Sequence, residues 1–173
     1  VCQPGLFNAE VKKAVAAYGL WYPPDPSSFE ICSIGGNIAT NAGGLCCVKY
    51  GVTTDYVLGM TVVLADGTAV RLGGPRLKDT AGLSLTKLFV GSEGTLGVIT
   101  EVTVQVHRVA PLRQVIAYMY PDWEHGIRGM HAIARSTDVS PTFTRLSDGP
   151  ETEFSLAMVK APTSTKGKVA AKV

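Results

Sequence analysis

Hydrophobic and polar positions change their period several times along the chain, and each period predicts a different element. Residues 9–18 carry apolar side chains at three- and four-residue spacing, which is typical of one helix face. Asn8 stands where a helix cap is favoured and Gly19 where a helix stops. The prolines of residues 23–26 predict an extended segment, because proline fixes φ and restricts the residue before it. A helical turn is predicted at residues 38–41, just after a glycine pair.

The middle of the chain has the pattern of a sheet. Residues 56–64 are apolar and rich in β-branched side chains, so they predict a strand. The Asp-Gly turn of residues 65–68 predicts a hairpin that returns along residues 69–72. Residues 102–106 alternate apolar and polar positions and predict a further strand, and residues 79–89 predict a short helix.

The pattern becomes more regular after Pro111. A strand at residues 114–120, a helix at residues 123–135 and a strand at residues 142–146 are predicted there, and they indicate a second α+β unit. From residue 160 the chain is polar and has no periodicity. The first helix follows a strand without an upstream partner, and the second unit has too few elements to close a sheet. We therefore expect a piece of a longer protein; the alternative is a small complete protein with frayed ends.

Composition narrows the classes of function. Hydrophobic residues make up 46% and charged residues 17%, which indicates a globular chain with enough apolar material for a core. The net charge of +2 is too balanced for a nucleic-acid binder, and the basic run at residues 166–172 is interpreted as a solvated end. The sequence contains no stretch of 18 apolar residues, so it predicts no membrane-spanning helix. The four cysteines lack the spacing of a zinc site, so we expect reduced thiols in a cytosolic protein and no metal.

Glycine provides the strongest functional signal. Residues 33–44 read Ser-Ile-Gly-Gly-Asn-Ile-Ala-Thr-Asn-Ala-Gly-Gly, with two glycine pairs around small residues and two asparagines. Glycine allows a ligand to approach the backbone, and successive N–H groups that point into a concavity attract phosphate. The stretch therefore predicts a loop that binds the diphosphate of a nucleotide cofactor; a glycine-rich surface turn is the alternative.

Five motifs in a fixed order connect this stretch to a known family. They lie at residues 23–28 (PPDPSS), 32–44 (CSIGGNIATNAGG), 49–51 (KYG), 55–59 (DYVLG) and 91–100 (GSEGTLGVIT). Together they resemble the FAD-binding domain of the vanillyl-alcohol-oxidase (PCMH) type, in the branch that contains the flavin-binding chain of glycolate oxidase and the D-lactate and D-2-hydroxyglutarate dehydrogenases. The segment at residues 141–154 resembles instead the cap of the alkyl-dihydroxyacetonephosphate synthase branch.

The resemblance implies an α+β fold. Residues 1–108 would be the second part of a PCMH-type FAD-binding domain without its N-terminal part, and residues 109–173 the start of an α+β cap domain. It also implies an enzyme that uses FAD to oxidise a 2-hydroxy acid by hydride transfer to the flavin, and that passes electrons to a quinone, a carrier protein or oxygen. The alternatives are an alkyl-transfer enzyme with the same cofactor and a non-catalytic nucleotide-binding module. The expected location is the cytoplasm, with peripheral membrane attachment as an alternative, and we expect the chain alone to be inactive.

The resemblance also implies a set of FAD contacts. The residues expected along the flavin and the ribityl chain are Pro24, Asp25, Cys32 and Ser33. Those expected at the diphosphate are Gly35, Gly36, Asn37, Thr40, Asn41 and Gly43, and those at the adenosine half are Glu93, Gly94, Gly97, Val98 and Ile99.

Each of these roles has a simpler alternative. Asp25 would be a turn residue, Glu93 a turn cap, and Cys32 a small buried apolar side chain. Reactive thiols at Cys46 and Cys47 are a minor alternative to inert ones. The catalytic residues stay unassigned, because no histidine here matches those of the family and their spacing does not suit a metal. For Arg145, an anion-binding role and a structural salt bridge stay open.

Overall fold

The computed structural model describes residues 1–158 and divides the chain into two units. The first comprises residues 1–115 together with 141–143, and the second comprises residues 116–140 with the chain from residue 144 onward. The predicted basic run at residues 166–172 and the polar end lie outside the described residues. The proposed domain boundary at residue 108, and the identity of each part, stay predictions.

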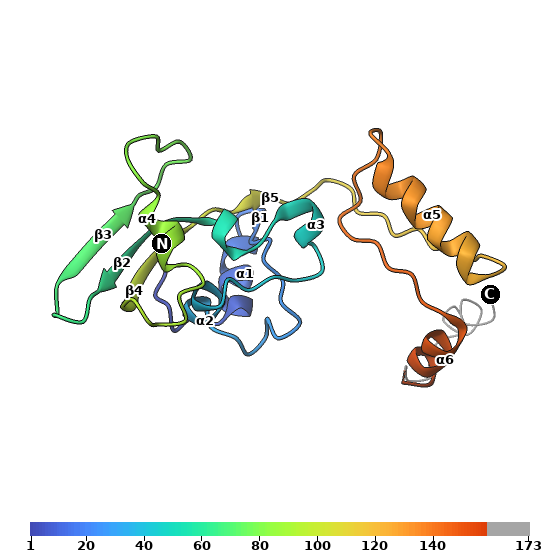
Figure 1. Ribbon diagram of the computed structural model, residues 1–173, viewed down its shortest axis with the longest axis horizontal. Helices are drawn as coiled ribbons and strands as arrows, with labels where there is room; N and C mark the ends of the chain where they lie inside the picture. The colour runs from blue at the N-terminus through green and yellow to red at the C-terminus, as the bar shows by residue number, and fades with distance from the viewer. Residues whose placement is uncertain (159–173) are drawn as a thin grey trace. The chain divides into compact units, whose positions relative to one another are not determined.

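A three-stranded antiparallel sheet forms the centre of the first unit (Figure 1). Strand β2 (Val57–Val63) lies in the middle, between β3 (Ala69–Gly73) and β4 (Val98–Val104). The β2–β3 hairpin places Val62 opposite Val70, and Gly67 occupies the positive-φ position of the turn, at +84°. The predicted strands and the hairpin are thus confirmed, although β4 begins earlier than the sequence indicated.

Helix α1 (Asn8–Ala16) precedes the two-residue strand β1 (Leu20–Trp21), and β1 pairs with β5 (His107–Arg108). The prediction of Asn8 as the cap is wrong by one residue. Phe7 is the N-cap, and its N–H donates to the Glu10 carboxylate at 2.8 Å. Asn8 is instead fully buried, and its side-chain amide donates to the Pro24 carbonyl at 3.2 Å. It therefore fastens α1 to the proline segment.

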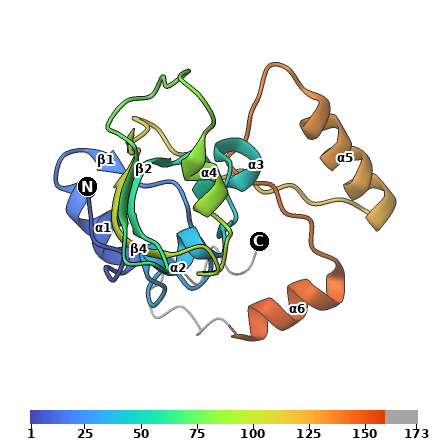
Figure 2. The same cartoon turned by 60° about the vertical axis from the view of Figure 1, so that its left-hand side comes forward.

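The core of this unit forms where α1, the proline segment and the short helix α2 (Ile34–Ala39) meet the sheet (Figure 2). Burying these side chains is the main stabilising contribution, about 1.5–3 kcal/mol for each large one. The side chains that are fully buried and apolar include Tyr22, Ile34, Ile38, Val62 and Val102. Helix α2, which contains the glycine motif, is thus anchored to the sheet by two isoleucines.

The first unit also differs from the sequence prediction in one helix and in several short elements. Helix α4 spans only Leu85–Phe89 and not residues 79–89. Gly82 has a φ of +75°, which is incompatible with a right-handed helix, so the helix can begin only after Gly82. Four short elements of the first unit escaped prediction: the strands β1 and β5, the helix α3 (Cys47–Tyr50) and the 3₁₀ turn η1 (Thr53–Asp55). Helix α3 and turn η1 follow the glycine motif directly, so they fix where its C-terminal end lies.

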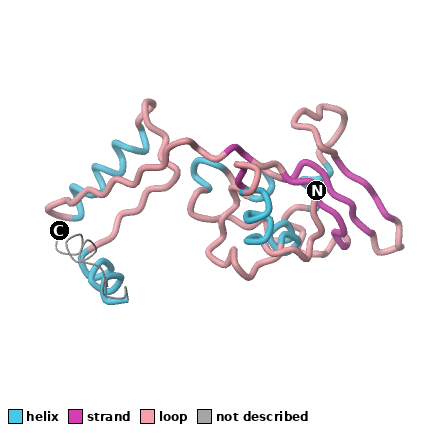
Figure 3. The backbone as a smooth tube through the Cα atoms, turned by 180° about the vertical axis from the view of Figure 1, so that it is seen from behind, coloured by secondary structure: helices cyan, strands magenta, loops and turns pink. Residues whose placement is uncertain are grey.

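The second unit contains helix α5 (Trp123–Arg135), which the sequence predicted at the same residues. The Asp122 carboxylate accepts the N–H of His125 at 2.9 Å and caps this helix. The strands predicted at residues 114–120 and 142–146 are wrong: both segments are irregular (Figure 3) and belong to none of the strand ladders of the described chain. A strand needs a hydrogen-bonded neighbour, and these segments have none.

Helix α6 (Gly149–Met158) was not predicted. Asp148 caps it by accepting the N–H of Glu151 at 2.8 Å, and Pro150 follows in its first turn. This Asp-Gly-Pro-Glu start is a recognisable helix signal that the apolar pattern concealed. Among residues 1–158, no helix is long and apolar enough to cross a membrane.

Candidate functional site

The glycine motif begins as a helix rather than as an open loop. Helix α2 starts at Ile34 and includes both Gly35 and Gly36, whereas the sequence predicted a helical turn only after them. Ser33 is the N-cap, and its Oγ accepts the N–H of Gly36 at 3.1 Å. A serine in that position is a standard helix start, so the signal was present in the sequence.

The first glycine pair makes its contacts within the protein. The N–H of Gly35 donates to the Pro4 carbonyl at 2.8 Å, and the N–H of Ile34 donates to the Leu6 carbonyl at 2.8 Å. A Cβ on Gly35 would lie 2.7 Å from the Cβ of Pro4. The absence of a side chain at Gly35 thus lets residues 4–6 pack on α2, which is a structural reason for this glycine.

The second glycine pair lies in an exposed loop, residues 43–46, which we call the amide loop. A Cβ on Gly44 would overlap both the carbonyl oxygen and the carboxylate of Asp25. The N–H of Gly44 donates to the Cys47 sulfur at 2.7 Å, and the N–H of Cys46 donates to Asp25 Oδ1 at 3.2 Å. None of the hydrogen bonds found within residues 1–158 uses the N–H of Gly43 or Leu45. These two exposed donors are therefore available to an anion.

The polar residues of the motif have different surroundings. Asn37 is only 2% exposed, and its side-chain nitrogen has no hydrogen-bond partner in the described chain. The Thr40 hydroxyl donates to the Gly36 carbonyl at 2.9 Å, within α2. Asn41 has a φ of +49°, and its Oδ1 accepts the N–H of Thr54 at 2.9 Å. Thr40 and Asn41 thus already have protein partners, whereas the side-chain nitrogen of Asn37 has no acceptor in the described chain for either of its N–H groups.

The second glycine-rich motif docks on the end of α2. The N–H of Gly91 donates to the Ile38 carbonyl at 2.8 Å, and that of Glu93 donates to the Ala39 carbonyl at 2.9 Å. Glu93 is exposed with a φ of +52°, and no atom lies within 4 Å of where a Cβ on Gly94 would stand. The structure therefore brings together two predicted segments that lie about fifty residues apart in the sequence.

The residues that follow this motif enter the sheet. A Cβ on Gly97 would lie 2.7 Å from Val62 Cγ1 and 2.8 Å from the Val63 carbonyl, so close strand packing requires glycine there. Ile99 packs against the core, whereas Val98 is 67% exposed. Of these three residues, Val98 offers apolar surface to a ligand.

The remaining predicted residues surround the start of the motif. Pro24 is fully buried, and its carbonyl accepts the Asn8 amide. Cys32 is half-buried, and its carbonyl accepts the N–H of Asn8 at 2.9 Å. Asp25 reaches the amide loop through Cys46. Asn8 thus connects the proline segment with residue 32, a role that the sequence did not reveal.

Three further residues near the amide loop were not among the named FAD contacts, although Gly44 belongs to the stretch that was predicted to bind the diphosphate. Gly44 and Leu45 form part of the loop, and Lys12 on α1 is close enough to Asp25 for their charges to interact. Burial lowers the pKa of Lys12, and the charge of Asp25 acts against that shift. Lys12 is half-buried, and nothing in the sequence around it signals such a contact.

Cys46 is expected to be unreactive at neutral pH. Burial, together with a hydrogen bond and the negative charge from Asp25, raises the pKa of its thiol to about 11. Since the thiolate is the nucleophile, alkylation of Cys46 by iodoacetamide should be slow at pH 8 and should rise about tenfold per pH unit until pH approaches 11. Mass spectrometry of a Cys47→Ser variant of the full-length protein measures this rate. A rate that levels off near pH 9 would contradict it.

Arg145 forms an ion pair with Glu151. Of the two roles considered for Arg145, the structural salt bridge therefore accounts for its geometry. Within residues 1–158, no three histidine, cysteine or acidic side chains are arranged to hold a metal.

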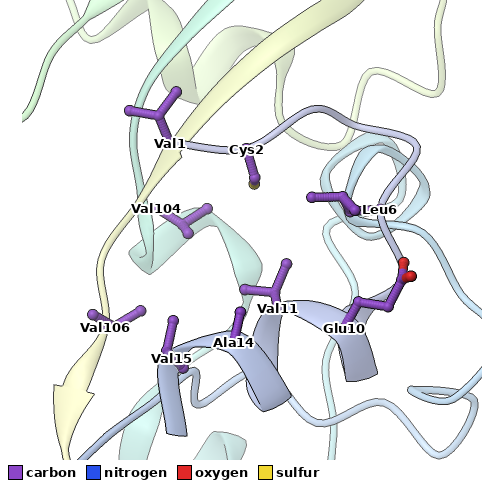
Figure 4. Close-up of a pocket in the computed structure, with 9 residues that line it drawn as sticks. All are labelled: Val1, Cys2, Leu6, Glu10, Val11, Ala14, Val15, Val104 and Val106. Atoms are coloured by element: carbon purple, nitrogen blue, oxygen red, sulfur yellow. The ribbon is translucent and has the colours of Figure 1, made fainter. Parts of the chain in front are cut away.

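An apolar pocket of about 420 Å³ opens between α1, residues 1–2 and the end of β4 (Figure 4). None of the predicted FAD contacts lines this pocket, so it is separate from the site described above.

Comparison with known proteins shows which proteins the chain is similar to. The sequence pattern of a family described as an FAD binding domain matches residues 1–73. Glycolate oxidase subunit GlcD of Bacillus subtilis is 42% identical over 166 residues, which cover 95% of this chain and 35% of that protein. A D-2-hydroxyglutarate dehydrogenase of Stutzerimonas stutzeri is 36% identical over 81% of this chain and 30% of its own length.

A solved structure described as alkyldihydroxyacetonephosphate synthase superposes with a TM-score of 0.78 at 30% identity, over 98% of this chain and 31% of that one. This chain therefore spans about a third of the length of these relatives.

Proposed function

Because the chain belongs to the family of PCMH-type FAD-binding oxidoreductases, we propose that the whole protein is an FAD-dependent enzyme that oxidises a 2-hydroxy acid. The substrate class is that of the named relatives, namely glycolate, D-lactate or D-2-hydroxyglutarate. The observation that carries the proposal is the 42% identity with a glycolate oxidase chain over 95% of the sequence.

FAD is the cofactor, and the donors of the amide loop fit it. A diphosphate offers only hydrogen-bond acceptors, and the N–H groups of Gly43 and Leu45 are exposed donors without a protein acceptor in the described chain. The amides of Gly35 and Gly36 donate within the protein, so we assign the diphosphate primarily to the amide loop. Gly43 is thus the member of the predicted set whose backbone is best suited to this role.

The other predicted contacts support the same cofactor less directly. Exposed Val98 and the open space at Gly94 suit the adenosine half, and Gly97 and Ile99 shape the sheet beneath them. We propose that Pro24, Cys32 and Ser33 border the ribityl side, and that Asn37, Thr40, Asn41 and Glu93 hold the surrounding backbone in place.

Bound FAD would supply a two-electron acceptor for the oxidation of the alcohol. The part of the chain that the structure describes would bind and orient the cofactor, while the catalytic base is not assigned among its residues. We propose that electrons pass on to a quinone, a carrier protein or oxygen, and that the enzyme acts in the cytoplasm or at a membrane surface.

One observation favours a second candidate. The superposition on alkyldihydroxyacetonephosphate synthase includes nearly the whole chain, including the second unit, at 30% identity. The same FAD-binding fold would then support an alkyl transfer without net oxidation of the substrate. The identity with the hydroxy-acid enzymes is higher, so we place oxidation first.

The test is turnover by the full-length protein loaded with FAD. Glycolate, D-lactate and D-2-hydroxyglutarate are each supplied with an artificial dye acceptor, with L-lactate as the stereochemical control. We expect one of the first three to bleach the flavin absorbance near ~450 nm and to reduce the dye. If none of the three bleaches the flavin while an acyl-dihydroxyacetonephosphate is converted, oxidation is excluded and alkyl transfer is supported.

A further inference from the structure

Asp25 lies against the amide loop at two of its residues, Gly44 and Cys46. Its Oδ1 accepts the N–H of Cys46 at 3.2 Å. Gly44 lies so close that a Cβ there would overlap the backbone and the carboxylate of Asp25. Asp25 thus contacts the loop on the C-terminal side of the Gly43 N–H, at Gly44 and again at Cys46.

The proline segment holds Asp25 in turn. Pro23 and Pro24 are fully buried, and the Pro24 carbonyl accepts the side-chain amide of buried Asn8. Proline also fixes the backbone on either side of Asp25, since Pro26 follows it. The carboxylate therefore projects from a rigid, anchored support.

The charge of Asp25 speaks against a direct contact with the diphosphate. An ionised carboxylate is only an acceptor and repels a phosphate. Lys12 lies near enough to reduce this repulsion, because its charge interacts with that of Asp25. A carboxylate near the diphosphate can instead accept hydrogen bonds from the protein. The hydrogen bond from the Cys46 N–H to Asp25 is of this kind.

We propose that Asp25 is a positioning residue that holds the amide loop in the conformation that presents Gly43 and Leu45 N–H to the cofactor's diphosphate. The proposal rests on the proposed function and deepens it. It differs from the role implied by family resemblance, in which Asp25 would lie along the flavin and the ribityl chain. The two roles predict different responses to a flavin that lacks the diphosphate.

The experiment uses the full-length apoprotein and measures the dissociation constants of FAD and of riboflavin by flavin fluorescence. Riboflavin contains the flavin and the ribityl chain but no diphosphate. Asp25→Ala should weaken FAD binding by at least about tenfold, which corresponds to about 1.4 kcal/mol, and should leave riboflavin binding within about twofold. Asp25→Asn keeps an oxygen acceptor for Cys46 and should retain FAD affinity within about threefold.

Asp66→Ala is the matched control, because Asp66 also accepts a backbone N–H, that of Thr68 at 2.9 Å, but in the β2–β3 hairpin. It should leave both affinities unchanged. An equal loss of FAD and riboflavin in Asp25→Ala, or unchanged FAD affinity, overturns the inference. Should Asp25→Ala not fold, the asparagine variant decides: a tenfold loss of FAD there also overturns it. If the unmodified protein binds no FAD, the proposed function fails first and this inference with it.

Discussion

Gly44→Ala should weaken the binding of FAD by the full-length protein strongly. The new Cβ would overlap both the Asp25 carbonyl and the Asp25 carboxylate. The carbonyl belongs to the backbone and cannot move away as a side-chain end can, and the carboxylate accepts the N–H of Cys46. The buried prolines on one side and Cys46 on the other resist a shift, so the amide loop itself must move. Overpacking of this kind costs about 1–3 kcal/mol, which is about 5- to 150-fold in affinity.

The measurement is a fluorescence titration of the apoprotein, with the melting temperature recorded in parallel. Gly5→Ala is the control, because no atom lies within 4 Å of its added Cβ. We expect it to bind FAD like the unmodified protein. A Gly44→Ala variant that is folded and binds FAD with unchanged affinity would show that the amide loop does not contact the cofactor.

Ile38→Ala should produce the largest loss of stability. Ile38 is completely buried between α2 and the sheet, and its carbonyl also receives the N–H of Gly91. Deleting a buried isoleucine side chain costs about 2–5 kcal/mol, because transfer energy is lost and a cavity remains. Since α2 then loses one of its two buried isoleucines beneath both glycine-rich motifs, FAD retention should fall as well.

Chemical denaturation of the full-length protein measures this change. Leu83→Ala serves as the control, because Leu83 is 88% exposed and its removal should change the free energy of unfolding by less than about 0.5 kcal/mol. Equal effects of the two substitutions would contradict the assigned position of α2 in the core.

Local patterns predicted the elements of the fold that are stabilised by short-range signals. The β2–β3 hairpin follows from Asp66-Gly67, and α5 was predicted at its observed residues, where the structure adds the cap at Asp122. The strands predicted at residues 114–120 and 142–146 failed for the opposite reason, because β-propensity requires a pairing partner that local sequence does not specify. The displaced start of α2 shows that Ser33 outweighed the two glycines that follow it.

The candidate site illustrates a related difficulty. Sequence reasoning assigned a ligand role to several glycines of the two glycine-rich motifs, but Gly35 and Gly97 are close to other parts of the chain, Pro4 and Val62 respectively. Close backbone approach explains these glycines without any cofactor. Which glycine faces a ligand depends on where distant residues pack, and for that reason Leu45 and Lys12 could not be found from the sequence.

Hydrogen–deuterium exchange of residues 41–47 tests the central claim most directly, namely that the amide loop binds the diphosphate of FAD. The full-length apoprotein is compared with the same protein saturated with FAD and with riboflavin. Exchange at Gly43 and Leu45 should slow markedly with FAD and stay near the apoprotein rate with riboflavin. Equal exchange in the FAD-bound and apo states at these two amides, with protection elsewhere in residues 1–108, would contradict the account.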